Sequence, residues 1–211
     1  TPRSSSAASD VYKRQTDKDL FFFVGDKKIR KLNGKLRVSE DPLDIGVLKL
    51  SDEHRPPYTE VNKKSLKITS LVSGQLPRQG KQYMVTGFPA SRSKPNWHFK
   101  EVKSELRPFL SGSLPHQEYE TFGIEPHEHL LLAYDKKHFF MLNDNRQVTS
   151  LAPHGLSGSP VWLVLDRVNE NDPSRTPLIG VVIEYDPRKK FVKACDIGFG
   201  LALIEQFENA V

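Results

Sequence analysis

Short apolar runs of six to eight residues recur along the chain, separated by glycine, proline and charged residues. Many of their members are β-branched or aromatic, which is typical of buried β-strands. We expect strands over residues 20–25, 67–72, 81–88, 130–135, 160–165 and 178–185. A series of short strands with turn residues between them predicts an all-β barrel or sandwich.

The last eleven residues, LALIEQFENAV at 201–211, have a different pattern. Leu201, Leu203, Ile204 and Phe207 fall on one face of a helix. The chain is therefore predicted to end in a short helix.

Residues 154–162, HGLSGSPVW, place a serine between glycines directly ahead of a predicted strand. Glycine lets the backbone bend sharply and turn its N–H groups toward one point. Such a loop can carry both an attacking hydroxyl, that of Ser157, and an oxyanion hole.

An aspartate opens another predicted strand, in DPLDIGVLKL at residues 41–50. Asp44 follows a proline turn and precedes an apolar run. A carboxylate at the start of a buried strand needs a strong partner. Asp44 is therefore a second candidate functional residue.

These two segments, in the order Asp then Ser, resemble the trypsin/chymotrypsin-like serine peptidases. Their Asp motif reads much like DIGVL at 44–48, and their nucleophile motif reads Gly-x-Ser-Gly-Gly-Pro. The resemblance implies two antiparallel six-stranded β-barrels and a C-terminal helix. It makes Ser157 the nucleophile, Asp44 the residue that orients a histidine base, and the N–H groups of Gly155 and Ser157 the oxyanion hole.

The details of the motif refine this resemblance. Ser159 replaces the second glycine, as in bacterial members of the family. Leu156 stands where animal members have an aspartate that pairs with a new N-terminus, so activation by that route is not expected. The resemblance places Leu151, Ile183 and Tyr185 around the substrate pocket, and an apolar base favours an apolar or small side chain over Arg or Lys.

The family's histidine precedes its aspartate, but no histidine precedes Asp44 in this sequence. Residues 5–15, SSAASDVYKRQ, match the translation of a sequencing adapter, so we expect residues 1–15 to be an artefact and the histidine to be missing from a truncated fragment. The remainder of the first barrel would span residues 16–75. The second barrel and the terminal helix would span 76–211.

Composition narrows the class of protein. With 37% hydrophobic and 27% charged residues, the chain is typical of globular proteins with a sizeable core. The net charge of +5 includes +2 from residues 1–15, and the other basic residues are scattered, which argues against nucleic acid as a partner. No apolar run is long enough for a membrane helix. A single cysteine, Cys195, allows no internal disulfide. Together with the form of the serine motif, the resemblance implies a bacterial, intracellular enzyme.

Other interpretations stay open beside a peptidase that acts on polypeptides without a cofactor. The same fold could serve as a non-catalytic peptide-binding module, or the chain could be an unrelated β-barrel binding protein. His127 and His129, at i and i+2, could contribute to a metal site, although a solvated loop suits them better and we assign no metal. The seven histidines all follow Asp44, and none is a strong candidate for the base.

Overall fold

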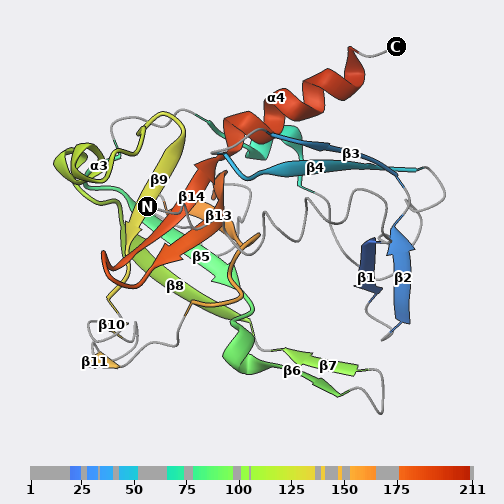
Figure 1. Ribbon diagram of the computed structural model, residues 1–211, viewed down its shortest axis with the longest axis horizontal. Helices are drawn as coiled ribbons and strands as arrows, with labels where there is room; N and C mark the ends of the chain where they lie inside the picture. Colours follow the sequence, from blue (N-terminus) through green and yellow to red (C-terminus); the bar gives the residue numbers. More distant parts are fainter. Residues whose placement is uncertain are drawn as a thin grey trace, which may run out of the picture.

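Most of the regular structure is β-sheet, and a helix lies at the C-terminal end (Figure 1). This computed structural model describes residues 20–24, 28–32, 34–39, 43–51, 66–73, 78–96, 101–104, 106–135, 139–140, 147–148, 153–164 and 176–209. The statements below refer to these residues.

A six-stranded antiparallel sheet forms the centre of the fold. Its strands are β5 (Gln82–Gly87), β8 (Arg107–Gly112), β9 (His129–Ala133), β12 (Pro160–Val164), β13 (Leu178–Asp186) and β14 (Phe191–Asp196). Their order across the sheet is β8-β5-β12-β13-β14-β9. The sheet curls far enough to bring its edge strands, β8 and β9, into contact. Ser113, directly after β8, forms a β-bridge with Leu132, and the Ser111 hydroxyl donates to the Ala133 carbonyl at 2.6 Å.

The concave side of the curled sheet holds the main hydrophobic core. Burial alternates along β5, since Tyr83 and Val85 are fully buried while Gln82, Met84 and Thr86 are more exposed. Side chains of a strand point alternately to its two faces, so every second residue enters the core. The cluster comprises Tyr83, Val85, Leu130, Leu132, Tyr134, Leu156, Val161, Leu163, Ile179, Val182, Val192 and Ala194.

A second, two-stranded sheet consists of β3 (Gly34–Val38) and β4 (Gly46–Leu50), and the C-terminal helix α4 (Ile197–Glu208) contacts β4, β13 and β14. The contact forms a separate apolar cluster of Ile45, Ile183, Cys195 and Leu203. Through this cluster, the strand that follows Asp44 is attached to β13.

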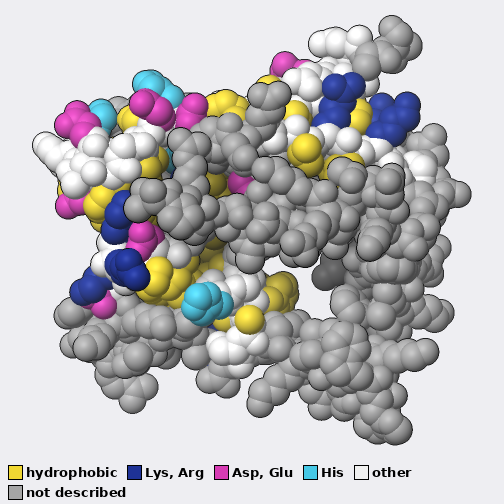
Figure 2. All heavy atoms as spheres, in the orientation of Figure 1, with side chains coloured by type: hydrophobic (Ala, Val, Ile, Leu, Met, Phe, Trp, Pro, Cys, Tyr) yellow, Lys and Arg dark blue, Asp and Glu magenta, His cyan; other side chains and the backbone are white. Residues whose placement is uncertain are grey.

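The remaining elements are short. Helix α3 (His116–Phe122) ends at Gly123, which has φ +64°. Three hairpins pair antiparallel strands: β1 (Leu20–Val24) with β2 (Lys28–Leu32), β6 (Ser93–Asn96) with β7 (Glu101–Ser104), and β10 (Phe139–Phe140) with β11 (Gln147–Val148). Two 3-10 turns are η2 (Ile68–Ser70) and η3 (Ala90–Arg92). Figure 2 shows acidic and histidine side chains gathered over α3, and basic ones over the β3–β4 sheet.

These elements confirm a mostly β protein with a C-terminal helix, which begins at Ile197, earlier than predicted. The strand predicted over 67–72 is wrong. There the carbonyls of Lys67 and Ile68 accept hydrogen bonds from the N–H groups of Ser70 and Leu71, which makes a 3-10 turn. The two six-stranded barrels are not confirmed, because the described strands form one curled six-stranded sheet and several two-stranded pairs. The predicted boundary between residues 75 and 76 lies outside the described residues, which stop at 73 and resume at 78.

Candidate functional site

The serine loop, residues 153–159, lies directly before β12, between the ends of β5 and β13. Sheet order places these two strands on opposite sides of β12. On one side, the Val182 N–H donates to the Ser159 carbonyl at 2.9 Å. On the other side, a Cβ atom on Gly87 would overlap the Ser159 side chain and lie 2.6 Å from Leu156 Cδ2. Glycine at position 87 therefore allows β5 to approach the loop closely.

Two glycines give the loop its shape. Gly155 has φ +88° and Gly158 has φ +86°, a region that residues with a Cβ rarely adopt. Gly155 is also packed closely, since a Cβ there would lie 2.8 Å from the backbone nitrogen of Ala90. That nitrogen donates to the His154 carbonyl at 2.8 Å. The sequence prediction that glycine has a structural role at position 155 agrees with this geometry.

The backbone N–H groups of the loop fall into two sets. Those of Leu156, Gly158 and Ser159 donate to the carbonyls of residues 153, 182 and 156 at 2.8 to 3.0 Å. Those of His154, Gly155 and Ser157 donate no hydrogen bond to any described residue. Backbone donors normally find acceptors, so these three N–H groups are available to an external acceptor, and those of Gly155 and Ser157 lie on either side of Leu156.

The side chain of Leu156, only 2% exposed, explains how the loop is anchored. It belongs to the main core, next to the buried residues of β5 and β12. The residue before the candidate nucleophile thus holds the loop by apolar packing rather than by an ion pair. Ser159 is buried too, whereas His154, Gly155, Ser157 and Gly158 are exposed.

Ser157 carries the exposed hydroxyl of the loop. Its Oγ donates to the carbonyl oxygen of Ile183 at 3.4 Å, a long contact that is weaker than an ordinary hydroxyl bond. The hydroxyl is therefore directed toward β13 and is only loosely held. It remains open to solvent and to a ligand.

Asp44 lies in a turn with φ +47°, one residue before the buried Ile45. Ser39 fixes this turn, because its N–H and hydroxyl both donate to the Ile45 carbonyl and its Oγ accepts from the Ile45 N–H. Ile45 packs in the same cluster as Ile183, whose carbonyl contacts Ser157. The structure thus brings the Asp44 and Ser157 segments to one residue of β13.

The three residues assigned to the pocket differ in their surroundings. Leu151 lies outside the described residues. The side chain of Ile183 is buried in the cluster with Ile45, so only its backbone faces the serine loop. The ring of Tyr185 lies 5.5 Å from that of Tyr134 and 6.1 Å from that of His154, both edge-on. Burial raises the pKa of Tyr185, and the charges of nearby aspartates raise it further.

The described histidines do not contact Ser157. His154 is exposed and lies against Tyr185, while His116 lies against Tyr119 of α3. His129 is buried at the start of β9, whereas His127 is exposed in the preceding turn. A metal site at positions i and i+2 needs both side chains on one face of a strand, which this pair does not provide. No group of three or more potential metal ligands occurs among the described residues. His54, His98 and His138 lie outside them.

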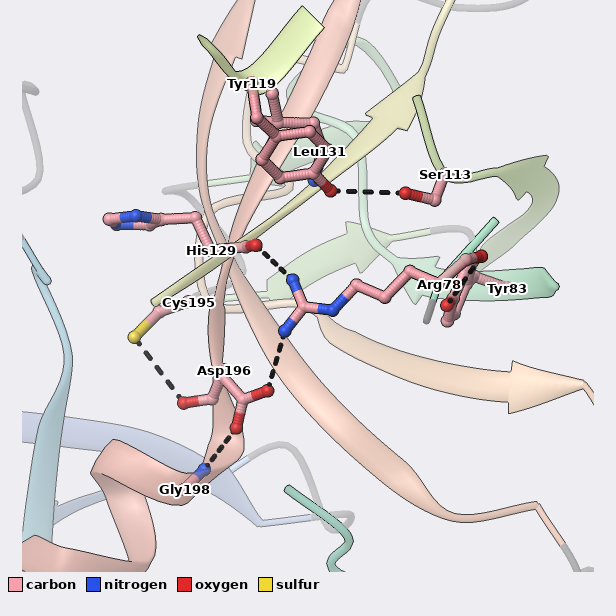
Figure 3. A network of polar contacts seen from close by, with 9 residues as sticks. All are labelled: Arg78, Tyr83, Ser113, Tyr119, His129, Leu131, Cys195, Asp196 and Gly198. Carbon is pink, nitrogen blue, oxygen red and sulfur yellow. Dashed lines mark hydrogen bonds and ion pairs between the residues drawn. The ribbon is translucent and has the colours of Figure 1, made fainter. Parts of the chain in front are cut away.

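A buried ion pair at the end of β14 was not predicted from the sequence (Figure 3). Arg78 and Asp196 are 3.0 Å apart, and each is about 6% exposed. Arg78 also donates to the His129 carbonyl, and Asp196 caps α4 by accepting from the Gly198 N–H at 2.8 Å. An aspartate ahead of a helix is a recognisable cap signal, but its pairing with a distant arginine is not visible in the sequence.

A second polar anchor attaches α3 to the sheet (Figure 3). The Tyr119 hydroxyl accepts from the Leu131 N–H at 2.8 Å and lies 3.2 Å from Ser113 Oγ. Burial raises the pKa of Tyr83, whose hydroxyl donates to the Arg78 carbonyl, to about 12. These contacts connect α3 and the residues before β5 to the sheet that supports the serine loop.

Comparison with protein-family models and with curated proteins finds no match to this chain. Among the described residues, no helix is long and apolar enough to cross a membrane.

Proposed function

We propose that this chain is part of a trypsin/chymotrypsin-like serine peptidase and carries its nucleophile, Ser157. The observation that supports this best is the pattern of backbone N–H groups in the serine loop. Those of Gly155 and Ser157, like that of His154 before them, donate to no described residue, while those of Leu156, Gly158 and Ser159 are bonded. An oxyanion hole needs two such donors next to an exposed nucleophile.

In the proposed reaction, Ser157 Oγ attacks the carbonyl carbon of a peptide bond and its proton passes to a histidine base. The two open N–H groups stabilise the oxyanion. The base then protonates the leaving amine, and water hydrolyses the acyl-enzyme by the same route. Asp44 orients the histidine and stabilises its charged form, a role that suits a strand end attached to β13 through Ile45. The reaction uses no cofactor or metal.

The proposal assigns the curled sheet to the second barrel and the β3–β4 sheet to the first, with the boundary near residue 75. A polypeptide substrate would extend along β13. Strand β12 pairs with β13 only as far as Val181, and Val182 bonds to the serine loop. Residues 184–186 therefore have a described strand partner, β14, on one side only, and the register of that pairing shifts at Ile183. An extended peptide can add to such an edge by main-chain hydrogen bonds.

The position of Tyr185 suits a small pocket. Its partly buried ring stands two residues after Ile183 on the strand that would hold the substrate. An aromatic side chain there limits the space beside the scissile bond, which agrees with a preference for small or apolar side chains.

The base is the part of the proposal that this sequence does not supply, since no histidine precedes Asp44. A serine that lacks its base keeps only the residual catalysis of the oxyanion hole and binding, about 10³–10⁴ over water. The chain should therefore acylate slowly, and a base added in solution should increase the rate.

The test is covalent labelling with an alkyl fluorophosphonate, with and without imidazole, followed by mass spectrometry of the protein and its peptides. We expect one adduct, on Ser157, that forms faster with imidazole and is absent in Ser157→Ala. Ser159→Ala, two residues away and buried, is the matched control and should still be labelled. Equal labelling of Ser157→Ala and the unchanged protein would refute the proposal.

A second candidate, a non-catalytic peptide-binding module on the same fold, is favoured by the free side of β13, where residues 184–186 have a described strand partner on one side only. Such a module would bind extended peptides along β13 with equal affinity in the unchanged protein and in Ser157→Ala. It would form no fluorophosphonate adduct at Ser157, even with imidazole. The same labelling experiment therefore separates the two functions.

A further inference from the structure

Two large apolar side chains are exposed where β5 ends and β8 begins. Phe88 is 48% exposed, although Gly87 and Pro89 on either side of it are buried. Leu106 is 52% exposed. In the antiparallel pairing of β5 with β8, Gly87 lies opposite Arg107 as the last pair, so Phe88 leaves β5 at the same end of the sheet at which Leu106 enters β8. Single exposed apolar side chains are ordinary on a protein surface, so the position of Phe88 next to the serine loop, rather than its exposure alone, makes it a candidate for contact with a ligand.

The segment that carries Phe88 contacts the serine loop directly. Gly87 approaches Leu156 and Ser159, and Ala90 donates to the His154 carbonyl. This contact lies on the β5 side of the loop, whereas Ser157 Oγ and Gly158 contact β13 on the other side. The loop thus has two flanks, and Phe88 lies at the flank away from β13.

We propose that Phe88 binds an apolar side chain of the polypeptide on the leaving-group side of the scissile bond. The inference rests on the proposed function. If the acyl part of the substrate extends along β13, the chain beyond the scissile bond leaves the loop on the opposite side, toward β5. Phe88 is then a specificity-determining residue for an apolar, preferably aromatic, residue of the leaving group.

Two reagents with the same alkyl group test this assignment in the presence of imidazole. With an alkyl diphenyl phosphonate, Ser157 Oγ bonds to phosphorus, the bond from phosphorus to one phenoxy oxygen breaks, phenolate leaves, and imidazole takes the hydroxyl proton. With the alkyl fluorophosphonate, the same bond forms and fluoride leaves. The first reagent places an aromatic leaving group on the proposed flank, whereas the second places a single small atom there.

The measured quantity is the ratio of the two labelling rate constants, diphenyl phosphonate over fluorophosphonate. We expect Phe88→Ala to lower this ratio about two- to tenfold, the range of an aromatic pair contact. Phe88→Tyr keeps the ring and should keep the ratio. Ile68→Ala removes another exposed apolar side chain, 58% exposed in η2, and should leave the ratio unchanged.

The possible results separate the two proposals. Labelling of Ser157 with the same ratio in Phe88→Ala and the unchanged protein would overturn the assignment of Phe88 alone. An equal fall of the ratio in Ile68→Ala would overturn it too, because the effect would not depend on position. Failure of both reagents to label Ser157 would overturn the proposed function, and this inference with it.

Discussion

Removing the carboxylate of Asp196 should destabilise the fold strongly. Arg78 and Asp196 are both almost fully buried and lie 3.0 Å apart. In Asp196→Ala the guanidinium remains buried without its counter-charge, a change that usually lowers the free energy of unfolding by about 3–5 kcal/mol. The same variant loses the cap on the Gly198 N–H, worth about 0.5–2 kcal/mol. We expect a total loss of about 3.5–7 kcal/mol, much of the stability of an ordinary domain.

Urea unfolding followed by tryptophan fluorescence and circular dichroism measures this loss, and a double-mutant cycle isolates the ion pair. Arg78→Met leaves the opposite charge buried and should also be costly. The double variant Arg78→Met/Asp196→Ala removes both charges, so its loss should be well below the sum of the two single losses. Asp196→Asn keeps an acceptor for the helix cap and separates that contribution.

An exposed ion pair in the same protein provides the control. Lys190 Nζ lies 2.8 Å from a carboxylate oxygen of Asp135, but the lysine is largely exposed. Lys190→Met should change the free energy of unfolding by less than about 1 kcal/mol. A loss below 1 kcal/mol in Asp196→Ala, or single losses that add fully in the double variant, would refute the reasoning from burial.

Three further predictions concern the loop and the core. In Gly155→Ala, φ +88° disfavours alanine, and the added Cβ would meet the backbone of Ala90. The variant should therefore lose about 1–2 kcal/mol in the free energy of unfolding and be labelled more slowly by the fluorophosphonate. Unchanged labelling would contradict this. Gly87→Ala should cost about 1–3 kcal/mol by overpacking against Ser159, as measured by urea unfolding. Burial, with the charges of nearby carboxylates, raises the pKa of the Cys195 thiol from 9.0 to about 12, so the native state keeps a proton that the unfolded state loses. The free energy of unfolding should therefore fall as pH rises from about 9 to about 12, and Cys195→Ala should make that fall less steep; an equal slope in both proteins would contradict the shift.

Local pattern was sufficient for part of the fold. The runs that became β5 and β12 alternate between buried and more exposed residues, and those that became β9 and β13 are almost continuously buried. Both patterns predict strands. The run at 67–72 has a similar composition, but residues 68–70 form a 3-10 turn, and only its last two residues join the sheet, through the bridge of Leu71 with Leu178 and the packing of Val72 on the core. Tertiary position outweighs propensity here. Helix α3 was missed because it is only seven residues long, although Pro115 before it and Gly123 after it are ordinary boundary signals.

The sequence predicted the shape of the serine loop but not the groups that surround it. The glycines around Ser157 indicated a sharply bent loop, and their positive φ values agree. The Ile183 carbonyl that contacts Ser157 is a backbone group, so no side-chain pattern could indicate it. The approach of Gly87 to the loop depends on strand order, which connects segments far apart in the chain. Phe88 could have been noticed only as a large apolar residue in a turn.

The meeting of β8 and β9 has a consequence for how the protein behaves at high concentration. An open sheet presents rows of unpaired N–H and C=O groups that can recruit strands from other molecules and start aggregation. Here the edges approach each other, because the Leu114 N–H donates to the Leu131 carbonyl at 2.8 Å and Ser111 bonds to Ala133. The curled sheet therefore protects its own margins, and intermolecular strand addition at β8 or β9 would first require these contacts to open.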